Sequence, residues 1–372
     1  MGPSETDTSK SASAEALLER AEALYAEGSF EEAADLFEQA ADASDLEDGS
    51  RVAHALHRGG VACWNAALHE RALELFSRAR DLHAASGDRS GEAGDLMCMG
   101  ASYSGLERYS EALSVLSESF RIREEIGDEK GMAFSANWLG IVSNNRGDYS
   151  MALKHHTKAL RLNEQSDNTG GIALAHNSIG LVYRHMDRYD RALEHLRKAL
   201  KLHREQGDGW GTSDTLSNIG LVYKNMGEYD DALRHLNEAL DLRRKVGGKG
   251  RISFILNNIG NLYTAMGRYE EALEAHEESL ALRREIGSPT MIAGALCNTA
   301  EAYLRSGRPR KALPLYDEAL ALIRHDRPVE LVLNLRSGLA DTYEELDRLP
   351  EALQTMREAL ELARTMWQKS GA

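Results

Sequence analysis

The chain has 372 residues, of which 42% are hydrophobic and 28% charged, and its formal net charge is -15. An acidic chain is a poor ligand for nucleic acid or for an anionic membrane, because both need a basic protein surface. No apolar run approaches the roughly 18 residues of a membrane-spanning helix, and the N-terminus has neither a basic start nor an apolar stretch. We therefore predict a cytoplasmic protein without nucleic-acid or membrane partners.

The first part of the chain, residues 1–13, is polar and is predicted to be a disordered leader. From residue 14 onward small residues recur with a period of 40. The alanine column consists of Ala72, Ala112, Ala152, Ala192, Ala232, Ala272, Ala312 and Ala352. Glycines or alanines stand 12 residues before each of these alanines, from Gly60 to Ala340. A fixed period indicates one supersecondary unit copied along the chain, so residues 14–372 are predicted to form a single array.

The unit that begins near residue 213 illustrates the predicted fold. Its first apolar stripe has spacings of three and four, as in an amphipathic helix, and comprises Leu216, Ile219, Val222 and Tyr223. A second helix is predicted from about Asp230. We expect the two helices to cross at Gly220 and Ala232, where a larger side chain would separate them, and Tyr223 to fill the space between units. Repeats are predicted to start near 14, 53, 93, 133, 173, 213, 253, 293 and 333.

Glycines mark the predicted helix ends. Gly227 recurs as Gly147, Gly267 and Gly307 and suits a left-handed residue at the end of the first helix. Other units replace it with Glu107, Asp187 and Asp347, where we expect the turn to be built another way, although Asp tolerates a left-handed conformation better than most residues. A second series closes the second helix and comprises Gly87, Gly127, Gly207, Gly247 and Gly287. Trp210 is expected in a loop between units.

The pattern Ile219-Gly220, Tyr223, Gly227, Tyr229, Ala232, Leu236 and Ala239 resembles the tetratricopeptide repeat. The resemblance implies an all-α solenoid, a right-handed superhelix of about nine helical hairpins. The common unit has about 34 residues, whereas this one has 40 and is similar to units of the Pins/LGN class and of bacterial signalling proteins. The G-protein-binding motifs of the Pins/LGN class are absent, so that role is not implied.

By the same resemblance, the first helix of each unit lines a concave groove. The predicted groove residues are Asn137, Asn144, Asn145, Asn177, Leu181, Arg184, His185, Leu221, Lys224, Asn225, Asn257 and Asn261, and Phe134, Leu174 and Phe254 occupy equivalent positions. Asparagines carry both a donor and an acceptor, so a row of them suits the backbone of an extended peptide. Arg184 and Lys224 are predicted to hold a carboxylate of that peptide. Alternatively, the asparagines are only polar residues on a solvated face.

No pattern predicts catalysis, a cofactor or a metal. His155, His195 and His235 occupy one position in three second helices, too far apart to share an ion, and the pair His54 and His57 lacks an acidic partner at helical spacing. Cys63, Cys98 and Cys297 have no metal or redox spacing and are interpreted as packing residues.

The last predicted helix, from Glu351 to about Gln368, carries Leu353, Met356, Leu360, Leu362 and Trp367 with no further helix to cover them. Either Trp367 folds back, or this face meets a partner or a second copy, so we predict a monomer with weak self-association. The predicted function is a non-enzymatic adaptor that binds a peptide segment of a partner protein in its groove. The alternatives are a sensor that responds to a peptide or small ligand, and a self-assembling scaffold.

Overall fold

A computed structural model describes residues 5–43, 49–323 and 329–370, and side chains between residues 14 and 365 of these ranges. All regular structure in the described residues is helical, and the helices divide between two compact units, Met1–Leu202 and His203–Ala372. The helices of the first unit are α1 (Glu5–Glu27), α2 (Phe30–Ala43), α3 (Gly49–Asn65), α4 (His69–Ser86), α5 (Arg89–Gly105), α6 (Tyr109–Glu125), α7 (Glu129–Asn145), α8 (Tyr149–Gln165) and α9 (Thr169–His185). Helix α10 (Tyr189–Glu205) contains the boundary.

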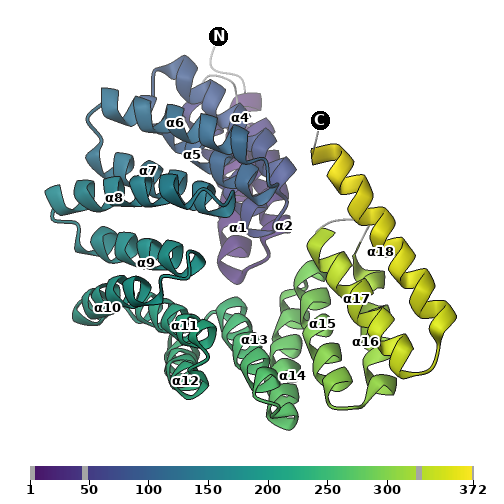
Figure 1. Ribbon diagram of the computed structural model, residues 1–372. Coiled ribbons are helices and arrows are strands. Elements are labelled where there is room, and N and C mark those ends of the chain that lie inside the picture. The colour runs from purple at the N-terminus through teal and green to yellow at the C-terminus, as the bar shows by residue number, and fades with distance from the viewer. Residues whose placement is uncertain (1–4, 44–48, 324–328, 371–372) are drawn as a thin grey trace. The chain divides into compact units, whose positions relative to one another are not determined.

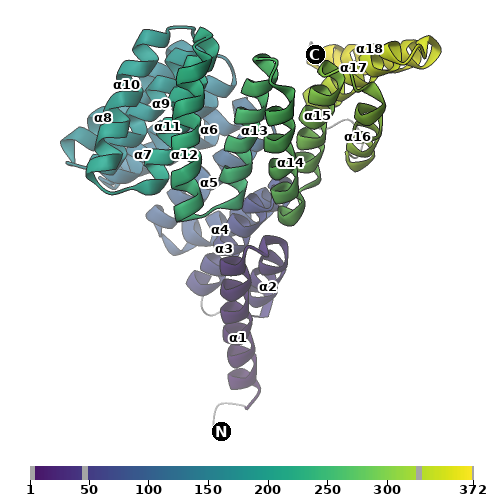
Figure 2. The ribbon, with the colours of Figure 1, turned by 90° about the horizontal axis from the view of Figure 1, so that it is seen from below.

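The second unit continues the pattern. Its helices are α11 (Gly209–Met226), α12 (Tyr229–Val246), α13 (Lys249–Ala265), α14 (Tyr269–Ile286), α15 (Pro289–Arg305), α16 (Pro309–Leu322), α17 (Val329–Glu345) and α18 (Leu349–Ser370). Within each unit, consecutive helices pack against each other in chain order (Figures 1 and 2). This arrangement confirms an all-α solenoid of helical hairpins with a 40-residue period. Helix α1 is already helical from Glu5; a disordered leader and a single uninterrupted array stay predictions.

The small residues of the repeat lie where two helices of a hairpin cross. Ala232 is fully buried, and a Cβ atom added to Gly220 would lie 2.8 Å from the Cγ atom of Leu236 and 3.2 Å from the Ala232 carbonyl oxygen. Tyr263 and Tyr303 pack with Leu273 and Ala302 between successive hairpins. Both predictions from the type unit, the close crossing and the tyrosine between units, are therefore confirmed.

The turn inside each hairpin requires a left-handed residue. Gly227 has φ +81°, and the residues that replace it in other units, Glu107, Asp187 and Asp347, also have positive φ values of 60°, 55° and 59°. The expectation of a different turn at these positions was therefore wrong: the backbone is the same even where a side chain makes it less favourable. Trp210 was expected in a loop but is the second residue of α11, which begins directly after the N-cap residue Asp208.

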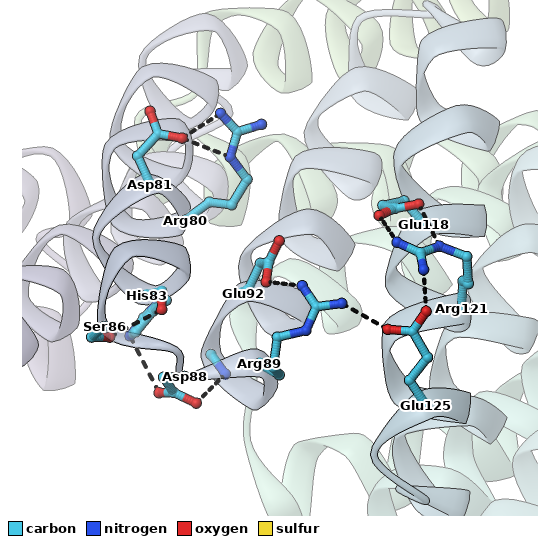
Figure 3. A network of polar contacts seen from close by, with 11 residues as sticks. Arg80, Asp81, His83, Ser86, Asp88, Arg89, Glu92, Glu118, Arg121 and Glu125 are labelled. Carbon is cyan, nitrogen blue, oxygen red and sulfur yellow. Dashed lines mark hydrogen bonds and ion pairs between the residues drawn. The ribbon is translucent and has the colours of Figure 1, made fainter.

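Side chains at helix starts cap the helix and join the two helices of a hairpin. Asp88 caps α5 by accepting a hydrogen bond from the Gly91 amide at 2.9 Å. Arg89 pairs with Glu92 in its own helix and donates from Nη2 to Oε2 of Glu125 in α6 at 2.8 Å (Figure 3). Exposed ion pairs of this kind contribute about 1 kcal/mol or less each, so packing rather than charge pairing supplies most of the stability.

Candidate functional site: the inner faces of the two units

The first helices of successive hairpins define one face of each unit, which we call its inner face. In the first unit α3, α5, α7 and α9 approach one another in sequence, and in the second unit α11, α13, α15 and α17 do so. In the described residues, the corresponding second helices do not approach each other as extensively. First helices that lie closer together than second helices curve each unit with the first helices inside. The predicted groove residues all lie on these first helices.

Asn137 of α7 needs a correction, because its amide is used inside the hairpin. The side chain is only 7% exposed. Its Oδ1 atom accepts a hydrogen bond from Nδ1 of His156 on α8 at 2.9 Å. His156 is itself buried against Gly140, where a Cβ atom would lie 2.5 Å from the imidazole Cε1. The amide oxygen of Asn137 therefore supports a buried histidine and is not free for a peptide, and the residue also lines the pocket described below.

The other predicted residues of the first unit are more accessible. Asn145 and His185 are exposed, and Asn144, Asn177, Leu181 and Arg184 are half-buried. Nη2 of Arg184 lies 2.9 Å from Nε2 of His185, whose ring packs edge-on against Tyr149. Burial lowers the pKa of Arg184, and burial followed by the charge of Arg184 lowers the pKa of His185. Because His185 is neutral, the charged group of this pair is the Arg184 guanidinium.

In the second unit the predicted Asn257 bonds to Asn298 of the next hairpin, which was not predicted as a groove residue. Nδ2 of Asn298 on α15 donates to Oδ1 of Asn257 on α13 at 2.7 Å. Leu221, Lys224 and Asn261 are half-buried, and Asn225 is exposed. Arg184 lies in the first unit and Lys224 in the second, so their joint action on one carboxylate stays a prediction.

The first unit contains a pocket that was not predicted from the sequence. It has a volume of about 250 Å³ and lies between α7, α8 and the start of α9. Phe134 and Leu174, which are 52% and 40% exposed, form apolar walls. Asn163 and Asn168 also line the pocket, and Nδ2 of Asn168 donates to Oδ1 of Asn163 at 2.8 Å. The pocket therefore combines apolar walls with amide groups.

Protein-family models match most of the repeats. A tetratricopeptide repeat model matches residues 132–205, 171–245, 211–285, 251–325 and 291–365, which together cover more than half of the chain. The chain belongs to the tetratricopeptide repeat (TPR) family. A second tetratricopeptide repeat model matches residues 7–48, and a model described as anaphase-promoting complex subunit 5 matches residues 59–146. No curated protein matches the chain.

Solved structures share the TPR fold at low sequence identity. A Rap protein complexed with competence and sporulation factor is 14% identical, with a TM-score of 0.61, and the match covers 96% of this chain and 99% of that one. The apo form of RapI is 17% identical, with a TM-score of 0.56, over 74% of this chain and 99% of that one. BtubC (BKLC) from P. vanneervenii is 21% identical, with a TM-score of 0.50, over 58% and 90%. At these identities the likeness concerns the fold alone.

Two side-chain clusters of the first unit join different TPR hairpins and were not predicted. The buried carboxylate of Asp95 on α5 lies 2.6 Å from Nδ1 of His57 on α3 and 2.6 Å from Nδ1 of His83 on α4. Trp64 of α3 meets Trp138 of α7 edge-on, with ring centroids 6.5 Å apart. Local spacing holds no signal for such partners, because they lie 12 to 74 residues apart in the sequence.

The described residues contain no group of three or more His, Cys, Asp or Glu side chains suited to a metal ion. Burial raises the pKa of Cys63 to about 11 and of Cys98 and Cys297 to about 12, with smaller effects of nearby charges. These thiols are therefore protonated near neutral pH. In the described part of the chain, no helix has the length and apolar character needed to cross a bilayer.

Proposed function

We propose that this TPR protein is a non-enzymatic adaptor that binds a peptide segment of a partner protein on the inner face of its first unit. The observation that carries the proposal is the pocket between Phe134 and Leu174. Its volume of about 250 Å³ is below the roughly 300–1,000 Å³ of sites for drug-sized ligands, so it suits a single apolar side chain. An exposed apolar pair beside buried amides is typical of an anchor site in a protein interface.

The polar residues around this pocket favour an extended peptide. Asn145 is exposed and Asn177 is half-buried on the neighbouring first helix, and in this proposal their amides bond to the backbone of the peptide. Arg184 supplies a cation for a carboxylate of the peptide. The Rap protein of similar fold was solved as a complex with competence and sporulation factor, which supports a binding role for this architecture.

The partner is therefore a protein or peptide rather than nucleic acid, in agreement with the net charge of -15. A location in the cytoplasm remains part of this proposal. A sensor that changes its curvature on binding is distinguished from a rigid adaptor by small-angle scattering with and without peptide, because a rigid adaptor keeps its radius of gyration.

A random peptide library displayed on phage provides the test. We expect the full chain to select peptides that share an apolar anchor, and Phe134→Ala/Leu174→Ala to bind these peptides about tenfold or more weakly. Phe254→Ala, an apolar truncation on the inner face of the second unit, is the matched control and retains binding. Selected peptides that bind Phe134→Ala/Leu174→Ala as tightly as the unchanged chain would contradict the proposal.

A further inference from the structure

Helix α18 exposes an apolar face. The equivalent faces of the earlier second helices in the second unit are buried or half-buried. Leu353, Met356 and Leu360 of α18, here named the C-terminal face, are 61%, 53% and 51% exposed. One period earlier, Tyr316 is buried, with Leu313 and Leu320 half-buried beside it. Two periods earlier, Leu273, His276 and Leu280 are all buried. The C-terminal face therefore has the side chains of an inter-repeat interface but is exposed in the described part of the chain.

The preceding hairpins show which side chains complete this interface. Leu273 of α14, the equivalent of Leu353, packs against Ala302 and Tyr303 of α15. Leu280 of α14, the equivalent of Leu360, shares a hydrophobic cluster with Ala293 and Leu296 of α15. A helix that covers the C-terminal face thus needs a small residue, a leucine three residues later and an Ala-Tyr-like pair further along.

Charge pairing continues from one second helix to the next and then stops. Arg204 pairs with Glu238 of α12 at 2.5 Å between Nη2 and Oε1, and the equivalent pairs Arg244–Glu278 and Arg284–Glu318 measure 2.7 Å. Arg364 on α18 occupies the same repeat position as these arginines. It is exposed, and it forms no ion pair with any residue that the structure describes. The C-terminal face is therefore flanked by a cation that matches a carboxylate on the second helix of an added hairpin.

The beginning of a second copy does not have this chemistry. Counted back from the turn glycines Gly28 and Gly267, Arg20 of α1 occupies the position of Ile259 of α13. Ile259 is buried, and Leu339 at the same repeat position shares a hydrophobic cluster with Tyr316 of the preceding hairpin, whereas Arg20 is exposed. Stacking α1 of one molecule on α18 of another would bury this guanidinium. Moreover, Gln39 stands where α14 has Glu278, so Arg364 would gain no carboxylate.

We propose that the C-terminal face binds a helical hairpin of a partner protein. The first helix of this hairpin supplies small and apolar residues against Leu353, Met356 and Leu360, and its second helix supplies a carboxylate to Arg364. This surface extends the established packing of α12 to α18 and is separate from the inner-face pocket. The proposal holds whether or not that pocket binds a peptide.

The first test uses a hairpin of known fit as the probe. A fluorescent peptide with residues 289–322 is titrated into the full chain and followed by anisotropy. It contains α15, which packs on α14, and α16, whose Glu318 pairs with Arg284 of α14. We expect saturable binding that Leu353→Glu/Leu360→Glu weakens about tenfold or more. Arg364→Glu also weakens it, and a probe with Glu318→Arg recovers it. Phe254→Ala on the inner face is the control and has no effect.

The second test does not depend on the folding of a peptide. If the C-terminal face accepts a repeat helix and Arg20 prevents a second copy from supplying it, we expect the unchanged chain to be monomeric and Arg20→Ile to self-associate as its concentration rises. Adding Leu353→Glu/Leu360→Glu to Arg20→Ile restores the monomer, as measured by light scattering. A probe that fails to bind together with a monomeric Arg20→Ile overturns the proposal. Unchanged chains that associate through Leu353 and Leu360 also overturn it, because the occupant is then a second copy.

Discussion

His276 of α14 provides a direct link between packing and pH. It occupies the repeat position of Leu236 and Tyr316, is 1% exposed, and lies against Gly260, whose added Cβ would be 2.5 Å from the imidazole Cε1 atom. Neither ring nitrogen has a hydrogen-bond partner among the described residues. Burial, followed by the nearby charge of Arg283, lowers the pKa of His276 from 6.5 to about 4. The folded chain therefore holds this imidazole neutral.

The sign of the pH effect follows from the two pKa values. Above pH 6.5 both the folded and the unfolded states keep His276 neutral, so the group has little effect on stability there. Between 6.5 and about 4 the unfolded state binds a proton that the folded state does not, and stability falls as the pH falls. One pKa unit corresponds to about 1.4 kcal/mol, so the loss between about pH 7.5 and about pH 5 is about 2 kcal/mol.

His276→Leu removes this loss. The substitution places the residue of the α12 hairpin, Leu236, in the same setting opposite a glycine. We expect it to stabilise the chain by about 1 kcal/mol at neutral pH, because two buried nitrogens without partners disappear. The advantage grows by about 2 kcal/mol at about pH 5. Urea denaturation followed by circular dichroism at both pH values measures the difference.

Tyr316→Phe is the matched control, because it changes the same repeat position. Burial raises the pKa of Tyr316 far above the range of the experiment, so its effect on stability is the same at both pH values. If the advantage of His276→Leu over the unchanged chain does not grow between neutral pH and pH 5, the argument from imidazole burial is refuted.

Further substitutions test the helical scaffold. Gly260→Ala should destabilise the chain by about 1–3 kcal/mol, because the new Cβ meets the His276 ring; thermal unfolding measures it, and an unchanged melting temperature would contradict the close packing. Gly94→Ala, in a helical position with nothing within 4 Å of the added Cβ, should instead stabilise by about 0.5–1 kcal/mol in the same assay. Asp148→Ala should lose about 1 kcal/mol in urea denaturation, because Asp148 caps α8 through the Met151 amide at 3.1 Å; Asp148→Asn keeps an acceptor and should lose less.

Most of the scaffold was predictable because its causes are local and repeated. The 40-residue period identified the hairpins, but the expectation of a different turn at Glu107 and Asp347 was wrong, because both keep the left-handed backbone of the glycines. Helix starts were predicted less well. Trp210 follows Gly209 and was assigned to a loop. In the structure the Asp208 side chain caps α11 by accepting a hydrogen bond from the Gly211 amide, so the helix begins at Gly209 and includes Trp210.

The candidate site was predicted only in part, because position on a helix does not reveal a side chain's partner. Asn137 and Asn257 have equivalent places in their repeats, yet the first bonds to the buried His156 and the second to Asn298 of the next hairpin. His57 was interpreted without an acidic partner, and the structure supplies Asp95 from α5. The predicted contribution of Trp367 to the last helix lies outside the described side chains.

The sequence by itself determined that this chain is a series of TPR hairpins, because close helix crossings demand small residues at a fixed spacing. It also identified the first helices as the carriers of the candidate binding residues. Only the tertiary structure decided which of these side chains form hydrogen bonds within the scaffold. It also decided that Phe134 and Leu174 flank a pocket, and that the face of Leu353, Met356 and Leu360 is exposed. The physical reason is that burial and hydrogen bonding depend on neighbouring helices, which one period of the sequence does not contain.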